Sequence, residues 1–328
     1  MLIFADIVNA TILFAIPLLL VALGGMFSER SGVINIALEG IMIIGGLFSC
    51  LLLFYLDKSG FGPAHPQLSM FFAVLVAGGA GMLFSLFLAF AAINLKADQT
   101  IGGTALNILA PSLSIIVTWS FQGEANTTIL LPTWRAITPE TFGLTLENSL
   151  WERILFKSFF ITTPIAILLL IFSIIFLYKT KTGLRLRACG EHPQAADSVG
   201  VNVYRMRYLG VAISGFLGGI GGLAFTLAAG AGFQSSVAGY GFLALAVMIF
   251  GNWKPINILW TSLFFAFFKI LSTYSTLIPF LPDLSNIKGG EYIYLMLPYL
   301  VTMVVLVLTS KKSRAPKAEG IPYDQGKR

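Results

Sequence analysis

Asn35 and Glu39 form the polar pair whose types and spacing most readily suggest chemistry. They stand four residues apart in the segment SERSGVINIALEG, and residues four apart share one face of a helix. A carboxylate in the early turns of a helix is stabilised by the helix macrodipole, so the preferred interpretation is that both residues cap and anchor this helix. The alternative interpretation is that both line a pathway for a polar solute.

Lys269 and Asn107 are two further polar residues that fall inside long apolar runs. An unpaired lysine at the centre of a membrane costs about 2.5–3.5 kcal/mol. We therefore expect Lys269 either to face the bundle or water, as part of a pathway, or to extend its ammonium group to the interface. Asn107 could hydrogen-bond a neighbouring helix or contact a substrate.

Catalytic and cofactor motifs are missing from the sequence. There is no G-x-x-x-x-G-K-[ST] loop for nucleotide phosphates, no G-x-S-x-G and no H-E-x-x-H. Cys50 falls in an apolar run and Cys189 in a basic segment, so we expect no disulfide, and the two histidines lack neighbouring ligands, so we expect no metal site. These absences predict a non-enzymatic chain that binds no cofactor of its own.

The composition predicts an all-α polytopic membrane protein. Of the 328 residues, 56% are hydrophobic and only 11% are charged, whereas soluble domains carry about 25% charged residues. The net charge of +6 arises from clusters in loops and the tail, as membrane topology requires, and indicates no nucleic-acid partner.

The apolar runs predict about nine membrane helices, with eight to ten as the range. A spanning helix needs about 20 apolar residues, and the run over 237–250 is short enough to be broken or re-entrant. The nine runs are Ala10–Phe27, Val33–Tyr55, Leu68–Ile93, Ile101–Phe121, Ile154–Tyr178, Tyr208–Gly230, Val237–Phe250, Ile256–Thr276 and Tyr292–Thr309.

Charge sets the expected topology, because short loops rich in Lys and Arg stay on the cytoplasmic side. The segment Lys179–Arg207 carries six basic residues against Glu191 and Asp197, so we place it inside. Counting spans from it puts the N-terminus and the loop 122–151 outside and the tail 311–328 inside. We therefore expect one transmembrane domain over residues 1–310, followed by a cytoplasmic tail.

The middle of this basic segment, GEHPQAADSVGV, predicts one short amphipathic helix. Pro193 suits a first helical turn, Ala195 and Ala196 favour helix, and Gly200 suits the position just after a helix end. From spacing alone, the segment is either a solvated loop or a surface on which a soluble partner docks.

Three segments carry a resemblance to a known family: SERSGVINIALEG, GLRLRACGEHPQAADSVGVNVYRMRYLGV and FLALAVMIFGNWKPI. The chain resembles the permease subunits of ATP-binding-cassette importers for simple sugars, branched-chain amino acids and nucleosides, and most closely the nucleoside-type members. The resemblance implies a type II-like importer fold in which the helix after SERSGVINIALEG lines the translocation pathway. It also implies that a coupling helix seats in the ATPase, with contact residues Glu191, His192, Pro193, Ala195, Ala196, Asp197, Val199 and Gly200.

The resemblance also implies the chain's partners and substrate. The chain would form half of a membrane dimer, with a second and non-identical permease. A cytoplasmic ATPase would bind the ATP and magnesium, and an extracytoplasmic binding lipoprotein would deliver a nucleoside, most closely a purine. The expected location is the bacterial cytoplasmic membrane, in contact with lipid.

The sequence leaves two alternatives to a nucleoside importer subunit. A simple-sugar or branched-chain amino-acid permease would share the architecture and differ only in substrate. A self-sufficient secondary transporter or channel usually needs ionisable groups inside the membrane, and only Lys269 and Glu39 qualify here. The scarcity of such groups favours the ATP-driven importer.

Overall fold

The computed structural model describes residues 2–123, 126–137, 159–274 and 314–325, with Ile154 and several single residues between 293 and 307. Within these residues the regular structure is helical, with two isolated β-bridges, so the all-α prediction is confirmed. The elements are α1 (Leu2–Arg30), α2 (Leu38–Lys58), α3 (Phe61–Ala64), α4 (Pro66–Ala89), the π-helix η1 (Phe90–Asn94), α5 (Gln99–Gln122), the 3-10 helix η2 (Thr133–Arg135), α7 (Thr162–Lys179), α8 (Lys181–Glu191), α9 (Pro193–Ser198), α10 (Val203–Ala229), α11 (Tyr240–Phe250) and α12 (Pro255–Thr273).

Seven of these helices are long and apolar enough to cross a membrane. They match seven of the nine predicted spans, and α11 matches the run over Val237–Phe250, which is short as predicted. The ninth run, Tyr292–Thr309, lies outside the described residues apart from single positions, so the count of nine remains a prediction.

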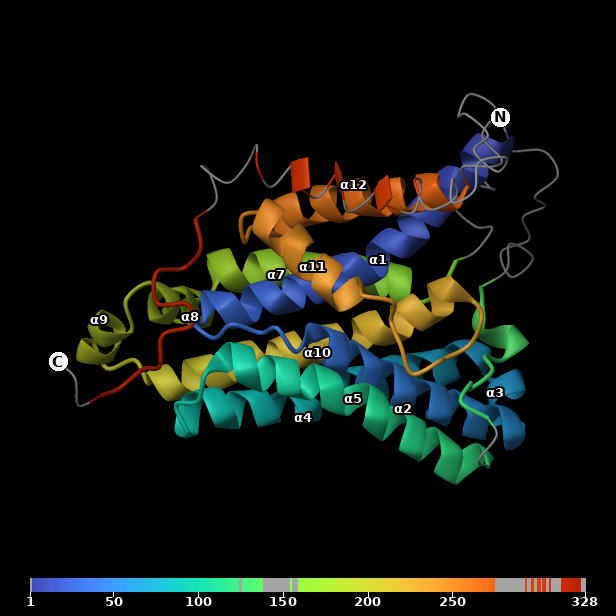
Figure 1. The fold of residues 1–328 in the computed structure, drawn as a ribbon, viewed down its shortest axis with the longest axis horizontal. Helices are drawn as coiled ribbons and strands as arrows, with labels where there is room; N and C mark the ends of the chain where they lie inside the picture. Colours follow the sequence, from blue (N-terminus) through green and yellow to red (C-terminus); the bar gives the residue numbers. More distant parts are fainter. Residues whose placement is uncertain are drawn as a thin grey trace.

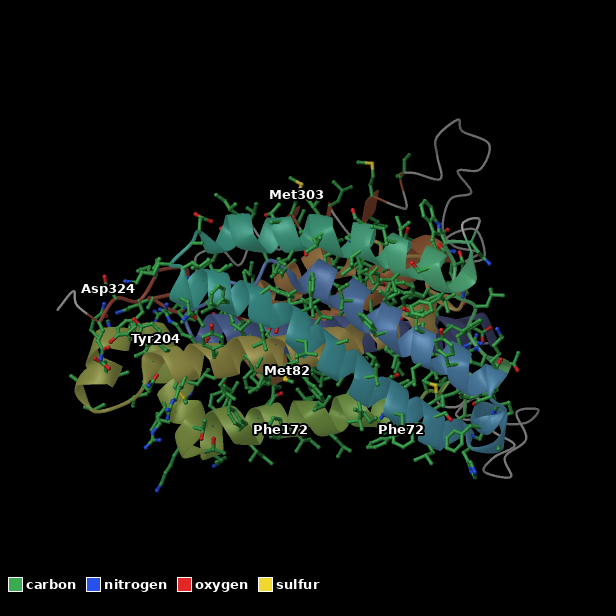
Figure 2. All side chains as sticks on the ribbon, turned by 90° about the horizontal axis from the view of Figure 1, so that it is seen from below. Phe72, Met82, Phe172, Tyr204, Met303 and Asp324 are labelled. Atoms are coloured by element: carbon green, nitrogen blue, oxygen red, sulfur yellow. The ribbon has the colours of Figure 1, made fainter. Side chains whose placement is uncertain are left out.

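The centre of the bundle is built from α1, α2 and α10, each with 78% of its most apolar window buried. Glycines let α10 touch α2 and α4: a Cβ on Gly222 would lie 1.9 Å from the carbonyl oxygen of Met42 on α2, and one on Gly219 would lie 2.0 Å from that of Ala77 on α4. Gly218 and Gly222 stand four residues apart on α10, and small residues at this spacing allow helix backbones to approach closely. Figure 2 shows Phe72 of α4 and Phe172 of α7 on the outside, where 41% and 48% of each residue is exposed.

The basic loops gather at one end of the bundle, which we call the basic end. Figure 1 shows α8, α9 and the C-terminal segment there, with the start of α1 at the other end. Arg30 donates a 3.1 Å hydrogen bond to the carbonyl of Trp253, and Lys96 pairs with Asp324 at 3.1 Å. The described parts of the basic segment and of the tail therefore meet at one end of the bundle, and the side of the membrane on which this end lies remains a prediction.

Two predicted boundaries differ from the structure. The helix predicted within GEHPQAADSVGV is α9, but it begins at Pro193 while Gly190 and Glu191 end α8, because His192 adopts an extended backbone (φ −145°, ψ 84°) before Pro193. A residue before proline is disfavoured in the helical region, which explains the break. The second span begins at Leu38 rather than Val33, because Gly32 has a φ of +95° and ends helical geometry after α1.

The crossing formed by residues 230–250 is broken. Figure 1 shows the chain leaving α10 and turning back toward the middle of the bundle before α11 begins. α11 has 11 residues and so rises about 16 Å, which is half of the about 30 Å hydrocarbon core. Its C-terminal turn lies at the basic end, where Arg30 binds Trp253, so its N-terminus lies about halfway along the bundle.

Candidate functional site

The junction between α1 and α2 is a non-helical stretch over residues 33–37, in which Val33, Asn35 and Ala37 are buried and Ile34 and Ile36 are half-buried. Backbone groups buried in a membrane protein need hydrogen-bond partners, and α5 supplies them. Gln99 accepts from the N–H of Ile34 at 2.7 Å. Asn107 donates to the carbonyl of Ile36 and accepts from the N–H of Gly40, both at 2.8 Å. The predicted pathway candidate Asn107 therefore joins the end of the junction and the first turn of α2 to α5.

Asn35 lies in the same junction and is fully buried. Its side-chain amide donates to the hydroxyl of Ser214 on α10 at 2.8 Å. Its side-chain oxygen has no hydrogen-bond partner among the residues that the structure describes. The side chain of Asn35 therefore points toward α10, and its side-chain oxygen remains without a partner among the described residues.

Glu39 caps another helix rather than its own. Its two carboxylate oxygens accept hydrogen bonds from the backbone N–H groups of Gly239, at 2.9 Å, and Gly241, at 2.7 Å. These donors belong to the N-terminus of α11, where Gly239 is half-buried and Gly241 is buried, and the partial positive charge of a helix N-terminus attracts a carboxylate. The sequence predicted that Glu39 anchors its own helix. The actual partner could not be found from local sequence, because Gly239 lies 200 residues away.

The structure does not bring Lys269 together with these three residues. Lys269 is half-buried on α12, and the neighbouring Ile270 packs against Ile7 and Ala10 near the start of α1. That position is far from the basic end and from the junction at residues 33–37. No hydrogen bond or ion pair joins its ammonium group to any other residue in the described part of the chain.

The predicted coupling residues divide by exposure. His192, Ala195, Val199 and Gly200 are exposed, Glu191 and Asp197 are half-buried, and Pro193 and Ala196 are buried. Ala196 is only 4% exposed, whereas Val199 is 77% exposed. α9 therefore offers one face to a partner and packs the other face against its own chain.

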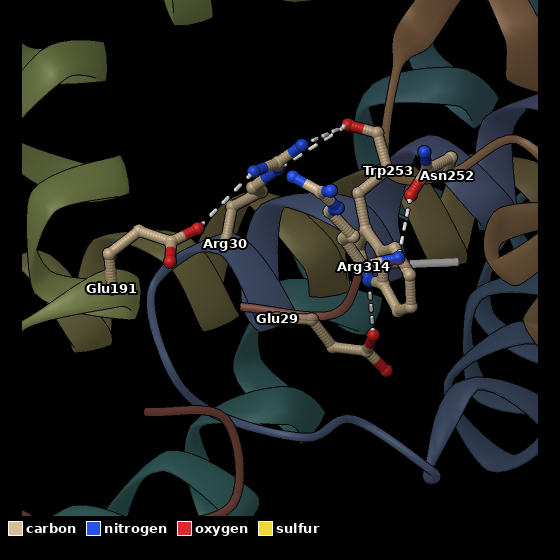
Figure 3. A network of polar contacts seen from close by, with 6 residues as sticks. All are labelled: Glu29, Arg30, Glu191, Asn252, Trp253 and Arg314. Atoms are coloured by element: carbon tan, nitrogen blue, oxygen red, sulfur yellow. Dashed lines mark hydrogen bonds and ion pairs between the residues drawn. The ribbon is translucent and has the colours of Figure 1, made fainter. Parts of the chain in front are cut away.

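A polar network at the basic end was missed by sequence reasoning (Figure 3). The indole N–H of Trp253 donates to the carboxylate of Glu29 at 2.5 Å, and Arg30 contacts Glu191 at 3.9 Å. The backbone N–H of Arg314 donates to the side-chain oxygen of Asn252 at 3.1 Å. These contacts tie α1, the turn before α12, α8 and the tail together.

The tail segment, residues 314–325, lies along this end. Ala318 donates to the carbonyl of Gly190 at 2.8 Å, and Arg207 donates to that of Ile321 at 3.0 Å. Tyr323 is 4% exposed and packs with Cys189, Ala196 and Val203. The tail segment thus supports the inner face of α9.

Glu319 in the tail segment faces the carboxyl group of Glu29. Burial raises the pKa of Glu319 to about 7, and the hydrogen bond with Glu29 opposes that shift. The proton on this pair therefore affects how the tail segment holds to α1.

An open groove of about 640 Å³ lies between α2, α4 and α5. Its lining carries no polar side chain that could orient a solute. The lining residues are Ile44, Phe48, Leu75, Val76, Gly79, Ala80, Leu83, Phe84, Phe87 and Leu113.

Comparisons with known proteins match nearly the whole chain, and those named below are all transport permeases. The family described as branched-chain amino acid transport system / permease component matches residues 7–308. The guanosine ABC transporter permease protein NupQ of Bacillus subtilis is 43% identical over 98% of this chain and 97% of its own length. The nucleoside ABC transporter permease protein NupC of Lactococcus lactis subsp. cremoris is 38% identical over 98% and 97%. No solved structure matches the chain significantly.

Proposed function

The chain belongs to the permease-component family of branched-chain amino acid transport systems, and from this premise we propose that it is the membrane subunit of an ATP-driven nucleoside importer. The observation that carries the substrate is the 43% identity, over 98% of the chain, with a guanosine permease. The 38% identity with a nucleoside permease supports the same class. A simple sugar or a branched-chain amino acid is the disfavoured alternative.

The coupling surface in this proposal is the exposed face of α9. His192, Ala195 and Val199 would seat in a cytoplasmic ATPase, which would hold the ATP and magnesium because this chain has no phosphate-binding loop. Glu191, Asp197 and Gly200 flank this face, and the buried Pro193 and Ala196 would hold its shape. Movement of α9 would pass through the tail segment to α1 and α10, which it contacts directly.

The basic end would face the cytoplasm, with the N-terminus outside and the tail inside. The clustering of Arg30, Lys96, the basic segment and the tail at one end supports this orientation. A binding protein would deliver the solute at the opposite end. Residues 126–137 lie there, because Trp134 donates a 2.6 Å hydrogen bond to Asp57 near the end of α2.

A second, non-identical permease would complete the translocation pathway. The outward face of α5 supports a partner, since only 17% of the most apolar window of α5 is buried in this chain. Asn35, Glu39 and Asn107 would act as supports for the pathway, holding α2, α5 and α11 in place. Lys269, which is remote from them, would extend toward the outer interface.

Uptake of labelled nucleosides, ribose and branched-chain amino acids tests the proposal. Cells would express this chain with its partner subunits, and a parallel sample would carry an ATPase that cannot hydrolyse ATP. We expect nucleoside uptake that disappears with the inactive ATPase. Uptake of only the other solutes would overturn the substrate, and uptake that persists with the inactive ATPase would overturn the importer.

A further inference from the structure

The segment between α10 and α11 has one buried side and one exposed side. Phe233, Ser235 and Val237 are buried, whereas Gln234, Ser236 and Ala238 are exposed, in strict alternation. The buried side is held in place, because the hydroxyl of Ser114 on α5 donates a 2.9 Å hydrogen bond to that of Ser235. The exposed side therefore has a fixed direction.

This exposed side lies inside the membrane. From Gln99 to Ser114, α5 rises about 22 Å from the basic end, and α11 rises about 16 Å from the same end to Gly239. Residues 235–239 thus lie between about 16 and 22 Å across a core of about 30 Å. Gln234 precedes them directly and follows Phe233, whose backbone pairs with Ile129 of residues 126–137, so Gln234 lies on the outer side of this range.

Polar groups at this depth do not face lipid without a large cost. The side chain of Gln234 has no hydrogen bond within the described ranges, and Ser236 accepts only from the N–H of Ala238, at 3.2 Å. The hydroxyl proton of Ser236 is therefore free to be donated. Both side chains must face an aqueous pathway or a facing permease.

An aromatic ring completes the surface. Phe242 lies in the first turn of α11, directly after Gly241, and is 51% exposed. The positive end of α11 beside it is already occupied by the carboxylate of Glu39. The surface thus offers a donor, an acceptor and a ring, but no positive charge for a phosphate.

We propose that Gln234, Ser236 and Phe242 form the solute-contact strip of this half of the pathway, a site that rests on the proposed nucleoside transport. Phe242 stacks on the base, while Gln234 and Ser236 hydrogen-bond the base edge or the sugar hydroxyls. Because Glu39 neutralises the helix end, the strip selects neutral nucleosides over nucleotides. Of the earlier candidates, Glu39 positions this surface through α11, while Asn35 and Asn107 hold the junction and the start of α2, which carries Glu39.

Cysteine labelling of the assembled transporter tests the exposure of the strip. The native cysteines Cys50 and Cys189 are both buried, so the background is low. We expect a membrane-impermeant methanethiosulfonate to modify Gln234→Cys and Ser236→Cys, and guanosine to slow that modification at least fivefold. Phe87→Cys, in the apolar groove, is the control and should stay unmodified. No modification at 234 and 236, or modification that guanosine does not slow, would overturn the strip.

Uptake by conservative variants tests its selectivity. Phe242→Leu and Gln234→Ala should change the ratio of guanosine to uridine uptake at least fivefold, and Phe242→Trp should restore it. Phe87→Leu, at a 66% exposed site, should leave the ratio unchanged. An unchanged ratio in both strip variants would overturn the inference. If the wild-type transporter moves no nucleoside at all, the proposed function fails instead.

Discussion

The carboxylate of Glu39, at the start of α2, accepts a 2.7 Å hydrogen bond from the backbone N–H of Gly241, in the first turn of α11. The contact joins a helix at the centre of the bundle to a helix that begins in mid-membrane. It also holds Phe242 and the preceding exposed segment in a defined place beside α2. A change in the angle between α2 and α11 would strain this contact, so it links the packing of these helices to the shape of the proposed pathway.

Removing this cap should destabilise the protein without exposing new surface. We expect Glu39→Ala to lower the free energy of unfolding by about 2 kcal/mol, since a charged acceptor and a helix cap are both lost. Glu39→Gln keeps one acceptor oxygen and should lose about half as much. Thermal unfolding of the purified transporter in lipid bicelles measures both. Equal stability of Glu39→Ala and wild type would show that the cap contributes nothing.

Glycine positions on α4 should differ sharply although they are neighbours. A Cβ at Gly81 would lie 2.4 Å from the carbonyl oxygen of Gly215, whereas one at Gly79 meets no atom within 4 Å. Gly81→Ala should therefore destabilise the bundle by about 1–3 kcal/mol through overpacking. Gly79→Ala should be neutral or stabilise α4 by up to about 1 kcal/mol. Thermal unfolding measures both variants. Equal changes in stability for Gly81→Ala and Gly79→Ala would contradict the close contact between Gly81 of α4 and Gly215 of α10.

The sequence predicts well where the membrane spans lie and which loops lie together at the basic end, because hydropathy and charge can be read from short stretches of sequence. It also indicates that the run over 237–250 is short. The contacts that place the candidate site, such as Glu39 with Gly239 and Ser114 with Ser235, join residues more than 100 positions apart. No local pattern in the sequence encodes these contacts. Asn35, Glu39 and Asn107 can be selected from the sequence because they are polar residues in or beside apolar runs. Nothing local indicates that Gln234 and Phe242 lie on one exposed surface.

The predicted coupling helix, α9, also depends on contacts that the local sequence does not encode. Sequence reasoning identifies α9 but treats Ala195 and Ala196 as equivalent, although one is exposed and the other is buried. Which face of a six-residue helix is covered depends on Tyr323, which lies more than 120 residues away in the tail segment. Ala196→Arg would consequently disturb the fold of α9 as well as its partner surface.

Substitution at Val199 gives a cleaner test of docking. Val199 is 77% exposed, so Val199→Asp changes the surface without displacing packed atoms. We expect it to reduce the amount of ATPase that copurifies with the membrane subunits at least tenfold while membrane insertion stays normal. Leu130→Asp, at a 72% exposed site near the opposite end, is the matched control and should retain the ATPase. Full ATPase recovery with Val199→Asp would exclude α9 as the docking surface.

The tail segment should protect Cys189. That thiol is fully buried under Tyr323, and burial raises its pKa to about 11 against the lowering effect of Arg207. We expect Tyr323→Ala to increase the rate of maleimide modification at least tenfold, because the contact that covers the thiol is lost. Cys189→Ser should abolish the signal, since Cys50 is 1% exposed. An unchanged rate in Tyr323→Ala would show that the tail segment does not cover α8 and α9.

The hold of the tail segment should also depend on pH through Glu319. Its pKa is about 7 in the docked tail, above the ordinary 4.5, because burial disfavours the charged form. The docked state therefore binds this proton more tightly, so docking is strongest below about pH 4.5 and weakens as the pH rises through about 7. We expect the rate of Cys189 modification in wild type, divided by the rate in Glu319→Gln at the same pH, to rise from pH 6 to pH 8. The ratio cancels the ionisation of the thiol itself. A constant ratio would mean that the carboxyl group facing Glu29 does not control docking.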